Sequence, residues 1–151
     1  MARAWRLQII VLLAVAAFVA AAVAVSWASG ADAWQEAGPV SKVKAIKPLY
    51  NEELEVFIVR TPDGLRALSA RGPLRDEKIE FCLTSKMFGG SYGMFDRYGN
   101  YYGGSAPRGM TRFPLRVEEG TVLVQTQEPI EGPPRQGPTP LEPEGPLCLW
   151  G

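Results

Sequence analysis

The chain has 151 residues, with 16 basic and 16 acidic side chains, two cysteines and no histidine. The absence of histidine excludes imidazole metal ligands, haem axial histidines and Ser–His–Asp catalysis. Because the charges cancel, no strong net charge draws the protein to nucleic acid, and we expect no nucleic-acid partner. The length fits one modest domain with appendages.

An uncharged, apolar run occupies residues 7–27. As a helix it would span roughly 31 Å, which is enough to cross the core of a bilayer. Arg3 and Arg6 precede the run, so we expect residues 1–6 to stay in the cytoplasm and the rest of the chain to lie on the extracytoplasmic side. The sequence therefore predicts a single-pass protein of the cell membrane.

A cleaved signal peptide is the alternative interpretation of this run. Small residues suited to a signal peptidase follow it, namely Ala28, Gly30, Ala31 and Ala33. Signal peptides usually have a shorter apolar region, of about 7–15 residues, so we favour the uncleaved anchor.

Residues 28–39 are expected to form a polar linker, and residues 40–127 a compact β domain. The run at 56–59 is rich in β-formers and leads into the turn Thr61-Pro62-Asp63-Gly64. In that turn proline presets one corner and glycine can take a positive φ. Residues 65–69 then return as a second strand, which predicts a hairpin.

A second hairpin is expected nearer the C-terminus. Residues 112–117 alternate as a strand, Glu118-Glu119-Gly120 forms a turn, and residues 121–125 return. No stretch after residue 30 keeps a helical period over more than a few turns. The predicted fold class of this region is therefore all-β.

Residues 128–151 form a proline-rich C-terminal tail, in which seven prolines exclude helix and central strand. The tail ends in the apolar cluster Leu147-Cys148-Leu149-Trp150. A purely solvated linker does not need such a cluster, so we expect the tail to fold back on its own domain or to dock on a neighbour.

The two cysteines, Cys82 and Cys148, are expected in a compartment that favours oxidation. A disulfide between them would tie the tail to the β domain and contribute roughly 4 kcal/mol on a loop-entropy estimate. The alternative is two separate thiols, since Cys82 follows Phe81 in a strand-like run.

Several short blocks of the chain, in the same order, resemble bacterial Rieske [2Fe–2S] domains. The first block is Val56-Phe57-Ile58-Val59-Arg60-Thr61-Pro62-Asp63-Gly64, followed by residues 67–71. The later blocks, at 95–100, 104–109 and 112–117, are similar to the family's post-cluster hairpin, proline loop and final strand pair. The resemblance implies a Rieske-like antiparallel β domain between the transmembrane helix and the tail.

The resemblance also implies where the cluster would sit, and no ligand is present there. A Rieske domain binds iron through a Cys-x-His pair and a Cys-x-x-His pair. The first pair would fall on Gly72 and Leu74, and the second loop, at 88–96, contains neither residue type. The vacated region comprises Gly72, Leu74, Phe88, Gly90, Ser91 and Tyr92. The cysteine pair that bridges the two loops in many Rieske proteins is also missing, and Glu77 stands where its first member is expected.

We therefore predict no cofactor, no metal site and no catalytic residue, because two thiolates cannot complete a cluster that needs four ligands. Glycines 72, 89, 90 and 93 allow close backbone approach, and apolar side chains are expected to fill the space. These side chains are Leu74, Phe88, Tyr92, Met94 and Phe95. The acidic residues Asp76, Glu77 and Glu80 are expected to form a solvated charged loop.

Three aromatic residues, Tyr101, Tyr102 and Trp150, are candidates for contacts with a partner. The family's habitat and the predicted anchor lead us to expect a non-catalytic subunit with a structural or assembly role. Its partners would be the membrane and the other subunits of a respiratory or photosynthetic electron-transfer complex. One alternative is a free-standing extracytoplasmic module that binds a ligand in the vacated site. Another is an electron carrier with an unusual centre.

Overall fold

The computed structural model describes residues 33–150, and these fold into three antiparallel sheets without an α-helix. The prediction of an all-β fold class is therefore confirmed. The N-terminal segment 1–6 and the predicted transmembrane helix at 7–27 lie outside the described residues. Within residues 33–150, no helix is long and apolar enough to cross a membrane.

The first sheet has the order β1-β11-β10 and comprises β1 (Gln35–Pro39), β11 (Thr121–Val124) and β10 (Leu115–Glu118). The second has the order β2-β3-β4-β9 and comprises β2 (Leu49–Asn51), β3 (Val56–Thr61), β4 (Gly64–Ser69) and β9 (Arg112–Phe113). The third comprises, in this order, β5 (Glu80–Cys82), β6 (Met87–Gly89), β7 (Gly93–Phe95) and β8 (Tyr101–Gly104). A short 3-10 helix, η1 (Val40–Lys42), follows β1.

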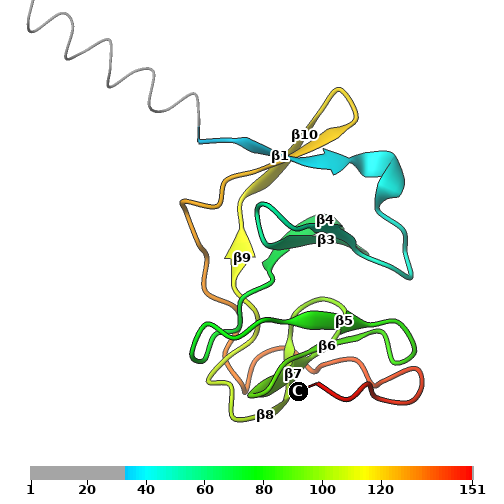
Figure 1. Ribbon diagram of the computed structural model, residues 1–151, viewed down its shortest axis with the longest axis vertical. Helices are drawn as coiled ribbons and strands as arrows, with labels where there is room; N and C mark the ends of the chain where they lie inside the picture. Colours follow the sequence, from blue (N-terminus) through cyan, green and yellow to red (C-terminus); the bar gives the residue numbers. More distant parts are fainter. Residues whose placement is uncertain (1–32, 151) are drawn as a thin grey trace, which may run out of the picture. The chain divides into compact units, whose positions relative to one another are not determined.

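The second sheet is the middle layer, and its strands β3 and β4 are covered on both faces (Figure 1). Along β3, Val56 and Ile58 pack with buried residues of the first sheet, whereas Phe57 and Val59 pack with buried residues of the third. Successive side chains of a strand point to opposite faces, so a continuous apolar run serves two cores at once. This double burial explains why residues 56–59 of β3 are apolar without alternation.

Both predicted hairpins are confirmed. Strands β3 and β4 pair from Val56↔Ser69 to Thr61↔Gly64, around the expected Pro-Asp turn. Strands β10 and β11 pair up to Glu118↔Thr121. Glu119 and Gly120 between them have φ values of 48° and 79°, the positive values that tight hairpin turns require.

The predicted strand at 112–117 is interrupted at Pro114. Proline has no backbone N–H to donate, and the chain changes sheets at this residue. Before it, β9 pairs with β4 in the second sheet, and after it, β10 pairs with β11 in the first. The prediction of one continuous strand at 112–117 is therefore wrong, because Pro114 divides it into β9 and β10.

The predicted linker at 28–39 also differs from the structure, because residues 35–39 form strand β1. This strand pairs with β11, and its register shifts between Glu36 and Gly38. Gly38 has a φ of 136°, which glycine adopts at a bulge without steric cost. The sequence predicted a linker here because Gly38 and Pro39, which are common in loops, occur in a polar stretch.

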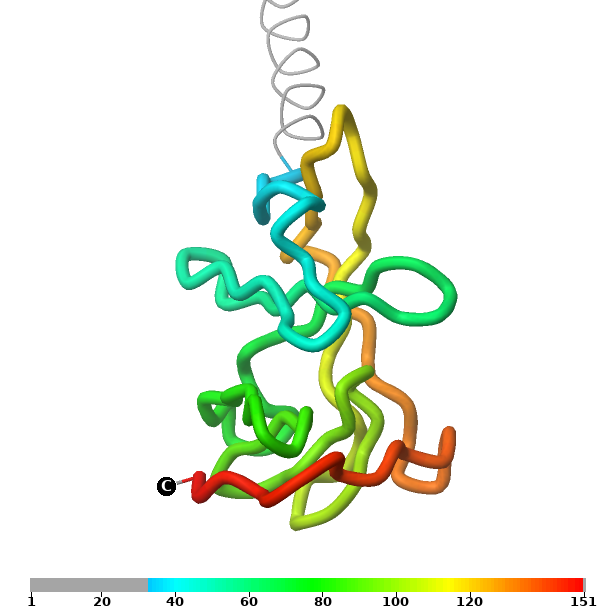
Figure 2. The backbone as a smooth tube through the Cα atoms, turned by 90° about the vertical axis from the view of Figure 1, so that its right-hand side faces the viewer, coloured from blue at the N-terminus to red at the C-terminus, as the bar shows by residue number. Residues whose placement is uncertain are grey.

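The proline-rich tail folds back on its own domain, which is one of the two outcomes expected. Figure 2 shows this C-terminal segment, in orange and red, running beside the layer that contains β5 to β8. Ile130 exchanges two backbone hydrogen bonds of 2.8 Å with Arg112, and the Gly109 N–H donates to the Pro133 carbonyl at 2.8 Å. The tail thus belongs to the same compact unit as the strands.

Candidate functional site

The two loops at which the resemblance places a cluster lie against each other. The first, residues 70–79, joins β4 to β5, and the second, residues 90–92, joins β6 to β7. A Cβ atom on Gly90 would lie 2.8 Å from the carbonyl oxygen of Lys78, so only glycine allows this approach of the two backbones. The structure therefore brings Gly72, from the first loop, into the same region as Gly90, Ser91 and Tyr92.

The side chain of Glu77 bridges the two loops. Its Oε2 accepts a hydrogen bond of 2.7 Å from the backbone N–H of Tyr92. The Gly72 N–H donates to the Glu77 carbonyl at 2.7 Å, and a Cβ on Gly72 would lie 2.5 Å from the Glu77 side chain. The carboxylate thus fills the space between the loops, near the position where the missing cysteine bridge is expected.

Burial changes the acid–base behaviour of this bridge. Partial removal from water raises the pKa of Glu77, while backbone N–H donors from Tyr92 and Ser91 act to lower it. Oε1 of Glu77 is buried without a hydrogen-bond partner in the described structure. The sequence prediction of a solvated acidic loop holds for Asp76 and Glu80, which are exposed, and is wrong for Glu77.

A second contact joins the loops at the surface. Arg75 donates a hydrogen bond to the Tyr92 hydroxyl at 3.2 Å, and its guanidinium carbon lies 5.2 Å from the centre of the Tyr92 ring. An exposed cation–π contact contributes about 0.5–1 kcal/mol. The contact between Arg75 and Tyr92 thus adds a small stabilisation to the link that Glu77 makes between the loops.

The space between the loops was predicted to be filled by apolar side chains, and the structure places the side chain of Glu77 there. Phe88 and Phe95 are fully buried in the core shared by the second and third sheets. Leu74, Tyr92 and Met94 are only half-buried. The sequence did not indicate which side chain would enter the gap, because Glu77 and Tyr92 are 15 residues apart.

The end of the tail is fixed to the third sheet next to the second loop. Cys82 of β5 and Cys148 form a disulfide that closes a sequence separation of 66 residues. Beside it, the Thr84 hydroxyl donates to the Pro146 carbonyl at 2.7 Å, and the Glu144 N–H donates to the Ser85 carbonyl at 3.0 Å. The disulfide and these two hydrogen bonds hold residues 144–148 of the tail against the third sheet.

The three aromatic residues that the sequence offers as partner contacts, Tyr101, Tyr102 and Trp150, take part in contacts between the tail and the third sheet. The Tyr102 hydroxyl donates to Glu142 at 2.9 Å, and this hydrogen bond raises the pKa of Tyr102. Arg135 donates to the Tyr101 hydroxyl at 2.6 Å and stacks over its ring. The indole of Trp150 packs so closely on Gly89 that a Cβ there would lie 2.5 Å from it.

Buried Asp96 is a further anchor of the tail that the sequence did not indicate. Its carboxylate accepts hydrogen bonds from the backbone N–H groups of Tyr98 and Asn100, at 2.8 and 2.9 Å. It also accepts from the Leu141 N–H of the tail at 3.0 Å. Arg97 next to it forms an ion pair with Glu144. These contacts fix the middle of the tail against the hairpin that follows β7.

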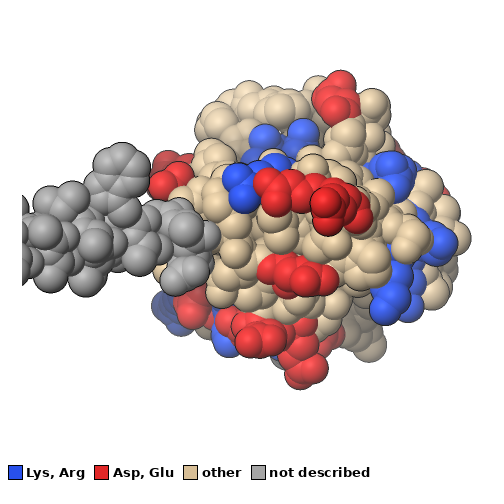
Figure 3. All heavy atoms as spheres, turned by 90° about the horizontal axis from the view of Figure 1, so that it is seen from above, with Lys and Arg blue, Asp and Glu red and all other residues tan. Residues whose placement is uncertain are grey.

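Among residues 33–150, no group of three or more histidine, cysteine, aspartate or glutamate side chains is arranged to hold a metal ion. No model of a known protein family matches the sequence, and no curated protein matches it either. Figure 3 shows one face of the molecule, on which acidic and basic side chains are interspersed.

Proposed function

We propose that this protein is a membrane-anchored, cluster-free, Rieske-like subunit. Its role is structural, in the assembly or bracing of a respiratory or photosynthetic electron-transfer complex on the extracytoplasmic side of the membrane. It is not an enzyme in this proposal. The predicted anchor at 7–27 supports the membrane location, and the block-by-block resemblance to Rieske domains supports the association with an electron-transfer complex.

One observation carries the proposal: the two loops that hold iron in the resemblance lie side by side and are bridged by Glu77. The bridge keeps the loop geometry with a carboxylate and backbone N–H groups, and it includes neither cysteine nor histidine. A fold that retains this geometry without redox ligands is suited to a structural role. We do not place a ligand site between the loops, because the Glu77 side chain occupies the gap.

Extraction of the full chain from native membranes tests the proposal. The chain would carry an N-terminal affinity tag, be solubilised in a mild detergent, and be analysed with its companions by mass spectrometry. We expect cytochromes or quinol-oxidising subunits in stoichiometric amounts. Recovery of the tagged chain alone as a monomer would contradict the proposal.

A further inference from the structure

All five lysines of the chain line three adjoining hollows on one surface of the domain. Lys42, Lys44 and Lys47 come from the segment between β1 and β2, whereas Lys78 and Lys86 flank β5 and β6. The hollows meet at Lys47 and Pro48, which line all three. We call this surface the lysine face.

The lysine face carries an excess of positive charge in a protein whose net charge is zero. Arg60 and Arg97 also line it, and the only acidic lining residue is Glu80. Glu80 lies 3.6 Å from Lys78, and Arg97 is paired with Glu144 of the tail. Within residues 33–150, the other lysines and Arg60 form no ion pair. Their charge remains available to an anionic partner.

One part of this face is an apolar groove of about 410 Å³ beside β5. Its floor includes Phe57 and Ile79, which are 5 % and 1 % exposed, and Phe81 is packed against the same core. Leu83 stands at the rim with 52 % of its surface exposed. A volume of this size lies within the usual range for a binding pocket, roughly 300–1,000 Å³.

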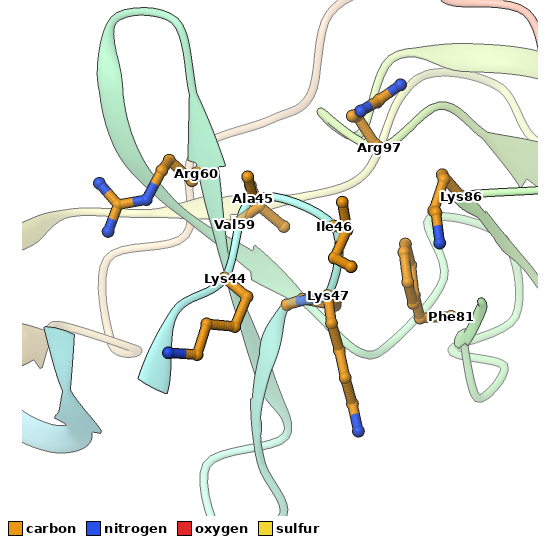
Figure 4. Close-up of a pocket in the computed structure, with 10 residues that line it drawn as sticks. Lys44, Ala45, Ile46, Lys47, Val59, Arg60, Phe81, Lys86 and Arg97 are labelled. Carbon is orange, nitrogen blue, oxygen red and sulfur yellow. The ribbon is translucent and has the colours of Figure 1, made fainter. Parts of the chain in front are cut away.

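The smaller hollow shown in Figure 4 extends the face past the groove. Ile46 lies there among Lys44, Lys47 and Lys86, and 61 % of its surface is exposed. An exposed branched aliphatic side chain between cations offers an apolar contact with charged surroundings. The whole face thus combines an apolar floor, apolar rims and cationic edges.

We propose that the lysine face binds an extended acidic segment of a partner protein, with one apolar side chain of that segment in the groove. Carboxylates on either side of this side chain would lie against Lys47, Lys78 and Lys44. The groove favours a peptide over a membrane surface. Its floor lies below the rim, and a flat layer of lipid headgroups would not reach the floor, whereas a single side chain of a peptide can. This inference rests on the proposed function only for the identity of the partner, another subunit of the complex.

Binding of a synthetic peptide to the full chain tests the inference. The chain would be held in nanodiscs of neutral phosphatidylcholine, and fluorescence anisotropy would follow a labelled peptide with a central leucine and two glutamates on each side. We expect this peptide to bind at least about tenfold more tightly than analogues with lysine for glutamate or serine for leucine. High salt should weaken the binding, since the charges are exposed to solvent.

Two double variants locate the binding. Lys44→Gln with Lys47→Gln should weaken binding of the acidic peptide about tenfold. Arg108→Gln with Arg116→Gln removes the same charge from positions outside the three hollows and should leave the affinity unchanged. Equal affinities of the two double variants, or no preference for the acidic peptide, would overturn the inference.

A lipid measurement separates the membrane from a protein partner. Acylation of the lysines would be compared by mass spectrometry in phosphatidylcholine nanodiscs and in discs containing phosphatidylglycerol. Equal acylation in both discs is expected. Protection by the anionic lipid, without discrimination between the peptides, would assign the face to the membrane and overturn the inference. If the peptide binds as described but native purification yields no redox subunit, the proposed function fails and the acidic-segment site stands.

Discussion

The carboxylate of Glu77 accepts a hydrogen bond from the backbone N–H of Tyr92, and this 2.7 Å contact joins the loop after β4 to the loop after β6. Gly72 in the first loop and Gly90 in the second allow the two backbones to lie close enough for the Glu77 side chain to span the gap. A polar side chain thereby takes the place that the resemblance gives to a cluster and a cysteine bridge.

Replacing Glu77 by alanine should lower the free energy of unfolding by about 1–3 kcal/mol, because the Tyr92 N–H loses its acceptor. Urea denaturation of the full chain in detergent measures the change, and hydrogen exchange at the Tyr92 amide locates it. The exposed neighbour Asp76 provides the control, since Asp76→Ala should change stability by less than about 0.5 kcal/mol. Similar losses for both variants would contradict the bridging role.

The raised pKa of Glu77 predicts a pH dependence of stability. Above the ordinary value of 4.5, and up to the raised value in the folded protein, the native state binds more protons than the unfolded state. The contribution of Glu77 to stability therefore falls as the pH rises through this window. Denaturation at several pH values should show that the wild-type chain loses stability relative to Glu77→Gln as the pH rises above 4.5.

Glu55 supplies a control of opposite sign. Its hydrogen bond to Arg71 lowers the pKa of its carboxyl, so its contribution is present above 4.5 and is lost as the pH falls. The wild-type chain should accordingly lose stability relative to Glu55→Gln on acidification. The same sign for both variants would show that the loops do not bury Glu77 as described.

Loss of the disulfide should release the end of the tail. The double variant Cys82→Ala with Cys148→Ala removes a cross-link over 66 residues, worth roughly 4 kcal/mol on the loop-entropy estimate. We expect a lower midpoint of urea unfolding and faster exchange of the Glu144 amide, which donates to the Ser85 carbonyl. Reduction of the wild-type chain should reproduce both effects, and unchanged exchange would show that the other tail contacts suffice.

The contact between Gly89 and Trp150 predicts a steric conflict that a second substitution relieves. Gly89→Ala should cost about 1–3 kcal/mol, since the new methyl group would displace the indole ring. In the Trp150→Ala background the same substitution should cost less, and a double-mutant cycle measures the difference. Gly103→Ala is the matched control, because a Cβ there would meet only Met94, at 3.4 Å. Additive costs would contradict the contact.

The predictable parts of the fold were those with a local signal. Apolar runs and turn residues predicted the hairpins at 56–69 and 115–124, and Cys82 and Cys148 were identified as a candidate pair. Strands β5, β6 and β7 have three residues each, too few to show a period in the sequence. Their position depends on the core that they share with β3 and β4.

Contacts between distant segments account for what the sequence did not predict. The tail has no regular pattern, and its path depends on partners such as Asp96, 45 residues before Leu141. The lysine face joins two segments that look like ordinary charged loops when read separately. In both cases the tertiary fold creates the feature.

The most direct test of a structural role is the amount of assembled complex in membranes that lack this chain. Native gels with haem staining and quinol-oxidation assays would compare membranes without the chain, with the chain restored, and with an empty vector. We expect a several-fold loss of an assembled redox complex and its recovery with the restored chain, although in this proposal the chain supplies no redox centre. Unchanged levels and activity of the redox complexes in membranes without the chain would contradict it.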